Sequence, residues 1–192
     1  MQKNIIQFKI RVAILEHISL LIGSLMIIED ENLLTKNEKE EITTGILGNN
    51  FPFYWDDDQV LQDGKPFLFH TIIRRDNGEL RSSVAPFFMK IVKRFALKHN
   101  LQCTHFYRGC INLTYPAPYH STPHKDHDSS VYEIIIYLNK IKTGSTFLLK
   151  DKKIFKEIKP KQFKAVCFKG DFTHYYDYPQ KGRRMVAVFS FN

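Results

Sequence analysis

The sequence predicts an α+β fold that is mainly β, in which helices come first and a β-sandwich or barrel follows. The prediction for the second half rests on short strand-like segments separated by Pro, Gly, Asn or Asp, as is typical of sandwiches and barrels. These segments are 103–115, 131–139, 146–149, 154–158, 165–169 and 185–191. The prediction for the first half rests on apolar residues that recur at helical spacing.

Two helices are expected before residue 100. Thr35 lies three residues before Glu38, the pattern of a capping box, so a short helix is expected through about Ile46. A longer helix is expected over 84–100, where apolar residues recur every three or four positions and basic residues lie on the other side. Between these helices, 67–74 has the composition of a strand.

Length and composition narrow the class of protein. The 192 residues are 43% hydrophobic and 25% charged, which predicts one globular domain over 1–192. Within it, 1–100 is expected to be a helical support region and 101–192 the β core that carries the chemistry. Three cysteines without a Cys-x-x-Cys pair exclude a disulfide framework and a cysteine zinc site. The net charge of +8 permits an anionic partner without demonstrating one.

The apolar run 18–28 near the N-terminus bears on the cellular location of the protein. It is shorter than the roughly 20 residues that cross a bilayer. An acidic segment follows it, where a signal peptide would have small residues at a cleavage site. We therefore expect no membrane partner and a cytoplasmic location, in the host cytoplasm if the protein is viral.

The segment 123–128 concentrates side chains that bind metals. Within it, His124 and Asp126 form the only His-x-acid pair of the chain. Residues two apart on an extended strand face the same side, so both side chains can approach one ion. Such a pair arises readily by chance, so a metal site requires a third ligand.

His174 is the best candidate for this third ligand. Two imidazoles and one carboxylate form the facial triad of non-haem Fe(II) sites, which leaves three coordination positions for a bidentate cosubstrate and O₂. A structural zinc site would instead close its fourth position with protein. Strand alternation or a turn is expected to point the neighbouring His127 and Asp128 elsewhere.

Arg184 begins the last predicted strand, ten residues after His174. It would share one strand face with Val186 and Val188, and that face is expected to point inward. A slip of one residue would place Arg183 there instead. A buried guanidinium is costly unless an anion neutralises it, and a dicarboxylate suits its bidentate fork.

The segment from about 103 to 192 resembles the double-stranded β-helix, a jelly-roll or cupin-like barrel, of Fe(II)/2-oxoglutarate-dependent oxygenases. The closest similarity is to their prolyl-4-hydroxylase-like branch. The motifs that agree are Tyr115-Pro116, His124-x-Asp126, Tyr137-Leu138-Asn139, Gly144-Ser145-Thr146-Phe147, and His174 followed by Arg184. Ser145 departs from the family, which commonly has glycine there. Phe51-Pro52-Phe53-Tyr54 also resembles a motif of related oxygenases, often of phage or bacterial origin.

The resemblance implies the cofactors and the roles of six residues. Fe(II), 2-oxoglutarate and O₂ would be required. The ligands of Fe(II) would be His124, Asp126 and His174. Arg184 and Tyr137 would bind the distal carboxylate of 2-oxoglutarate, and Tyr115 would line the cosubstrate pocket.

The implied activity is a dioxygenase that hydroxylates a C–H bond, with a prolyl or other protein or peptide residue as the first choice of substrate. A nucleic-acid oxygenase is less favoured, because Ser190 stands where base demethylases generally have a second arginine. A small-molecule oxygenase, for example of a free amino acid, is a further alternative. The last alternative is an inactive binding or virion protein with the same barrel.

Overall fold

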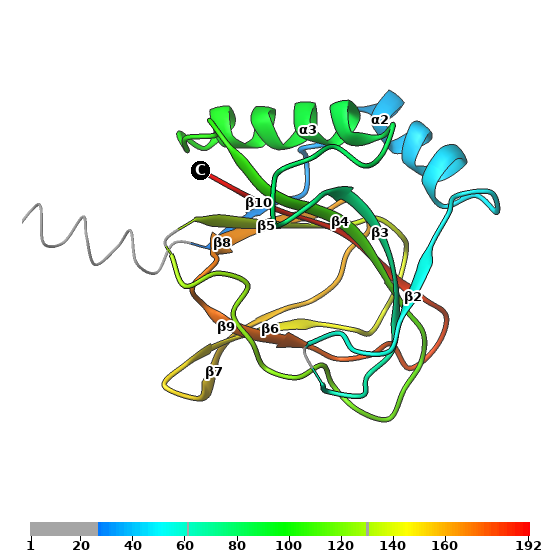
Figure 1. The fold of residues 1–192 in the computed structure, drawn as a ribbon, viewed down its shortest axis with the longest axis vertical. Helices are drawn as coiled ribbons and strands as arrows, with labels where there is room; N and C mark the ends of the chain where they lie inside the picture. The colour runs from blue at the N-terminus through cyan, green and yellow to red at the C-terminus, as the bar shows by residue number, and fades with distance from the viewer. Residues whose placement is uncertain (1–26, 61, 130) are drawn as a thin grey trace, which may run out of the picture.

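The structure is a computed structural model that describes residues 27–60, 62–129 and 131–192. Two antiparallel sheets face one another, and the helices lie over the outer side of the larger sheet (Figure 1). The chain is therefore mainly β with few helices, as the sequence predicts. Within the described ranges, no helix is long and apolar enough to cross a bilayer. The apolar run 18–28 lies outside these ranges except for its last two residues.

The larger sheet has seven strands in the order β1-β8-β5-β10-β4-β3-β2. Its strands are β1 (Ile28–Asp30), β2 (Tyr54–Asp56), β3 (Phe67–Ile73), β4 (Phe106–Thr114), β5 (Tyr132–Tyr137), β8 (Ala165–Lys169) and β10 (Arg184–Phe191). Three of these strands come from the first hundred residues. That region therefore supplies both edges of the sheet as well as the helices.

Both helices occur where the sequence predicts them. The helix α2 (Lys36–Glu41) begins with the capping box: the Thr35 hydroxyl accepts a hydrogen bond from the Glu38 amide, and the Glu38 carboxylate accepts one from the Thr35 amide. It continues as a π-helical turn over Ile42–Ile46. The helix α3 (Ala85–Lys98) packs its apolar face on the larger sheet.

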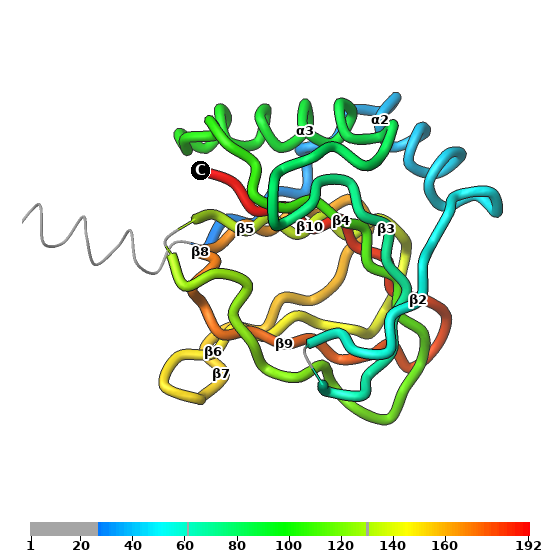
Figure 2. The backbone as a smooth tube through the Cα atoms, in the orientation of Figure 1, coloured from blue at the N-terminus to red at the C-terminus, as the bar shows by residue number. Residues whose placement is uncertain are grey.

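The smaller sheet has the order β7-β6-β9, with β6 (Thr146–Lys150), β7 (Lys153–Ile158) and β9 (Thr173–Tyr176). The segment between β4 and β5 runs beside β9 (Figure 2). Isolated bridges join His120 to Asp177 and His124 to His174. The segment that carries the His-x-Asp motif is thereby attached to the strand that carries the third candidate ligand.

Alternation along β10 separates two apolar clusters. Met185, Ala187 and Phe189 belong to the core between the larger sheet and the helices. Val186 and Val188 belong to a second core between the two sheets. The two-residue period that the sequence predicts for this strand is therefore observed, with the valine face pointing between the sheets.

Candidate functional site

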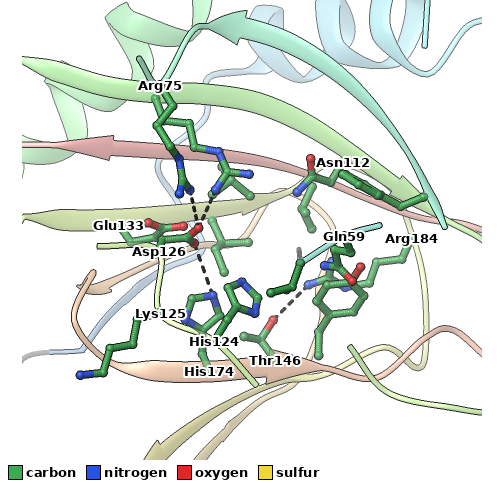
Figure 3. A pocket seen from close by; sticks show the side chains of 17 residues that line it. Gln59, Arg75, Asn112, His124, Lys125, Asp126, Glu133, Thr146, His174 and Arg184 are labelled. Atoms are coloured by element: carbon green, nitrogen blue, oxygen red, sulfur yellow. Dashed lines mark hydrogen bonds and ion pairs between the residues drawn. The ribbon is translucent and has the colours of Figure 1, made fainter. Parts of the chain in front are cut away.

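A cavity of about 310 Å³ lies between the two sheets (Figure 3). The two sheets and the segments at their ends contribute its walls. Apolar side chains from β5 and β10 line part of it, including Ile135, Val186 and Val188. The polar lining includes a group of two histidines and an aspartate and, apart from them, Arg184.

His124, Asp126 and His174 converge in this cavity, with one ligand atom of each within 4.8 Å of the others. The backbone positions the two histidines: the His124 amide donates to the His174 carbonyl at 2.9 Å, and the His174 amide donates back at 2.8 Å. The Nδ1–H groups of His124 and His174 donate to the carbonyls of Thr122 and Phe172, respectively. Each Nε2 is therefore left with a free lone pair, the arrangement usual for histidines that ligate metals.

The charge states of two of these groups suit a divalent ion. Burial lowers the pKa of His124, and the neighbouring His174 lowers it further. Burial alone would raise the pKa of Asp126, but the Arg108 guanidinium beside it holds that pKa well below its ordinary value. Neutral imidazoles and an ionised carboxylate form the donor set that fits Fe(II), so these residues fit the metal that the resemblance implies.

Arg184 lies in the same cavity, buried to 2% exposure. Its Nε donates to the Gly144 carbonyl at 3.1 Å, its Nη2 donates to Thr146 Oγ1 at 3.0 Å, and its Cζ lies 4.2 Å from the centre of the Tyr176 ring. Among the described residues, no carboxylate forms an ion pair with it. A buried guanidinium in this state is stabilised by an anionic ligand.

The neighbouring Arg183 lies elsewhere. Its Nη2 donates to the Leu47 carbonyl, and its side chain lines a hollow at the surface. Of the two arginines that the sequence leaves as alternatives, the structure places Arg184 in the cavity.

Comparisons with known proteins agree with this geometry. No family model and no curated protein matches the sequence. Solved structures do match. A 2OG-Fe(II) oxygenase family oxidoreductase from Burkholderia pseudomallei superimposes with a TM-score of 0.68 at 11% identity, over 88% of this chain and 85% of that one. The chain has the fold of the 2-oxoglutarate–Fe(II) oxygenases. The resemblance seen in the motifs is thereby confirmed for the fold.

Two further structures show how varied this oxygenase fold is. A prolyl hydroxylase from Trichoplax adhaerens, in complex with a hypoxia inducible factor peptide fragment, matches with a TM-score of 0.63 at 14% identity, over 97% of this chain and 91% of that one. The non-heme alpha ketoglutarate dependent epimerase SnoN from nogalamycin biosynthesis matches with a TM-score of 0.60 at 10% identity, over 93% and 83%.

The two tyrosines assigned by resemblance lie in different places in this oxygenase fold. Tyr137 is fully buried beside Arg184, and its hydroxyl forms a 2.8 Å hydrogen bond with Thr146 Oγ1. Tyr115 is 55% exposed and lines a separate hollow with Trp55. The role proposed for Tyr115 is therefore not supported. On β4 the even-numbered residues face the cavity, so Tyr115, just beyond the end of β4, lies on the opposite side.

The sequence alone does not identify several polar residues of the cavity. Arg108 and Arg75 donate to Asp126 Oδ1 at 2.6 and 2.7 Å. Glu133 is fully buried and accepts a hydrogen bond from Ser190, and burial together with the charge of Asp126 raises its pKa well above the ordinary value. The alternation along β4 could have placed Arg108 on the cavity side, but its pairing with a loop aspartate depends on tertiary structure.

Asn112 adds an unfilled polar position to the cavity wall. Its Oδ1 is buried without a hydrogen-bond partner among the described residues. Buried polar atoms are rarely left unpaired. The Asn112 oxygen suits a ligand that donates a hydrogen bond, and the guanidinium of Arg184 suits an anionic group.

Proposed function

We propose that the chain is an Fe(II)- and 2-oxoglutarate-dependent dioxygenase that hydroxylates a C–H bond, and that its two sheets form a double-stranded β-helix. One observation carries the proposal: a single cavity contains a His-Asp-His group and a buried arginine that pairs with no carboxylate of the described residues. His124, Asp126 and His174 would bind Fe(II). Arg184 would bind the distal carboxylate of 2-oxoglutarate.

Bound Fe(II), with 2-oxoglutarate and O₂, supplies the oxidising chemistry. The protein supplies position and environment. The carbonyls that accept from the Nδ1–H groups of His124 and His174 fix both rings with Nε2 toward the metal. Thr146 fixes Arg184 and is itself held by Tyr137, so the guanidinium is oriented before the cosubstrate binds. The valines of β10 exclude water between these two ends of the site.

The substrate that we favour is a prolyl or other residue of a protein or peptide. The match to a prolyl hydroxylase with a bound peptide fragment supports this choice. The match to an epimerase of a biosynthetic route supports a small-molecule substrate as the second candidate, since one fold hosts many functions. A nucleic-acid substrate is less favoured because Ser190 does not provide a second arginine and bonds to Glu133.

We also propose that the whole chain, 1–192, acts as one oxygenase domain and works in the cytoplasm. Strands from both halves of the sequence pair in the larger sheet, which supports one domain. The three cysteines are free, which suits a reducing compartment.

The proposal is tested by iron retention together with substrate-independent succinate formation. The protein reconstituted with Fe(II) is expected to retain about one iron and to form succinate slowly from 2-oxoglutarate and O₂. His124→Ala is expected to lose both properties, whereas His105→Ala, which alters an exposed histidine outside the cavity, keeps them. Full iron retention in His124→Ala would refute the ligand assignment. For the substrate class, peptide, oligonucleotide and amino-acid pools are searched by mass spectrometry for the mass increase of one added oxygen atom.

A further inference from the structure

Two arginines meet at one oxygen of the candidate metal ligand. Arg75 follows β3 and Arg108 lies on β4, and both donate to Asp126 Oδ1. Figure 3 shows Arg75 and Asp126 above the two histidines. The other oxygen, Oδ2, lies 3.5 Å from His174 Nε2. The carboxylate therefore presents one oxygen to the histidines and the other to the arginines.

The two guanidinium groups at this wall outnumber the carboxylates that pair with them in the described part of the chain. Asp126 is the only carboxylate that forms an ion pair with Arg75 or Arg108 in the described part of the chain. Glu133, on the same wall, accepts from Ser190 and pairs with neither arginine. A divalent ion bound through Asp126 would share the charge of that carboxylate and increase the excess.

The arginines also have donors to spare. A guanidinium offers five N–H groups, and Asp126 takes a hydrogen bond from one nitrogen of each arginine. The Arg75 side chain is 51% exposed, so it can be reached from solvent, while that of Arg108 is 22% exposed. Lys125 also lines the cavity, but its side chain points away from the histidines (Figure 3).

A second hollow lies on the other side of the two arginines' shared lining, and Asp56 is the one carboxylate among the described residues that line it. It has a volume of about 150 Å³ and runs along β3 and β4. Arg75 and Arg108 line both spaces, and Phe67 and Phe69 give the second hollow an apolar wall. A molecule lying here could place an acidic group at the arginines and an apolar part against the phenylalanines.

We infer that Arg75 and Arg108 bind an oxyanion, a carboxylate or a phosphate, that the substrate carries close to the carbon that is oxidised. Guanidinium groups bind both anions through charge-assisted, often bidentate hydrogen bonds. This inference rests on the proposed function, because it places the anion beside the metal. It narrows the substrate to acidic molecules, such as a peptide with an acidic or phosphorylated side chain near the target residue or a small organic acid.

Binding of simple anions near the metal tests the inference without a turnover measurement. The full chain is loaded with substoichiometric Mn(II), a paramagnetic substitute for Fe(II), and saturated with 2-oxoglutarate. Acetate and inorganic phosphate are then titrated in separate samples, and the relaxation of the acetate methyl protons and of the phosphate ³¹P nucleus is measured per bound Mn(II). The variants are Arg75→Gln and Arg108→Gln. The matched control is Arg74→Gln, which alters the preceding arginine, paired with Asp76 outside the cavity.

Saturable relaxation by at least one anion is expected in the unaltered protein and in Arg74→Gln, with binding about tenfold weaker in each of the other two variants. The anion that binds more tightly identifies the carboxylate or the phosphate as the preferred group. Equal binding in all four proteins would place the anion on the metal and overturn the inference, as would the absence of saturable binding.

Failure of the proposed function gives a different result. Mn(II) retention and its response to 2-oxoglutarate are followed in the same samples by electron paramagnetic resonance. If His124→Ala retains Mn(II) as the unaltered protein does, the metal site itself is wrong and both proposals fall. If Mn(II) and 2-oxoglutarate bind as expected but the arginine variants bind the anions normally, only the inference about the substrate falls.

Discussion

Replacing Arg184 with methionine is expected to abolish most of the affinity for 2-oxoglutarate without unfolding the protein. Methionine preserves much of the apolar stem, which packs against Gly144, and removes only the guanidinium. Two of the five N–H donors of Arg184 bond to Gly144 and Thr146, so three remain for a ligand carboxylate. Two charge-assisted hydrogen bonds, at about 1.5–3 kcal/mol each, give a loss of about 3 kcal/mol or more, or more than about 100-fold in affinity.

Thermal unfolding measures this loss directly. A ligand at 100 times its dissociation constant stabilises a protein by about 2.7 kcal/mol, which corresponds to roughly 5–11 °C for a chain of this length. The unaltered protein and Arg183→Met, the matched control, are expected to show this shift with Mn(II) and 2-oxoglutarate, and Arg184→Met to show almost none.

The ligand-free variant provides a second readout. Arg184 is a buried cation that pairs with no carboxylate in the described part of the chain. Arg184→Met is therefore expected to be at least as stable as the unaltered protein when 2-oxoglutarate is absent. A normal shift with 2-oxoglutarate in Arg184→Met, or an equal loss in Arg183→Met, would refute the reasoning.

Three further predictions concern metal retention, the glycine turn and the helices. Asp126→Asn removes the anionic ligand and is expected to retain less than about a tenth of the iron that the unaltered protein retains, as measured by elemental analysis. Asp128→Asn, which alters an exposed aspartate, is expected to keep its iron. Equal retention in the two variants would contradict the assignment of Asp126 as a ligand. Gly144 and Gly182 both have positive φ, but a Cβ at Gly144 would lie 3.0 Å from Arg184 Cδ whereas nothing lies within 4 Å at Gly182. Alanine at either position is expected to lower the free energy of unfolding in urea by about 1–3 kcal/mol. Only Gly144→Ala is also expected to bind 2-oxoglutarate more weakly, as measured by calorimetry. Arg94→Met is expected to lower the free energy of unfolding in urea by about 1–3 kcal/mol, because it breaks a bidentate, partly buried ion pair between Arg94 of α3 and Glu38 of α2. An unchanged midpoint would show that this ion pair does not stabilise the helices.

The sequence predicts the structure correctly where the structure depends on a local pattern of residues. The two-residue period of β10 places Arg184 and the valines on one face, and the structure agrees. The capping box at Thr35 predicts the start of α2 for the same reason, because its interactions span only three residues. The His-x-Asp spacing puts His124 and Asp126 together. The third member, His174, is a candidate from the sequence, but its place beside them depends on a backbone pairing across the fold that no local pattern encodes.

The residues that the sequence misplaces or misses have different physical causes. Tyr115 was assigned by similarity of motif, but the alternation of β4 turns it away from the cavity. Arg75 lies 51 residues from the aspartate that it contacts, and no local pattern encodes that contact.

The central claim is that the two ends of one cavity hold Fe(II) and 2-oxoglutarate together. Anaerobic addition of Fe(II) and then 2-oxoglutarate to the full chain measures this most directly, because chelation of the metal by the cosubstrate gives a weak visible charge-transfer absorption. We expect the band in the unaltered protein and in Arg183→Met. In Arg184→Met it should appear only at much higher concentrations of 2-oxoglutarate, and in His174→Ala it should be absent. Absence of the band from the folded, unaltered protein, or its persistence in His174→Ala, would contradict the account.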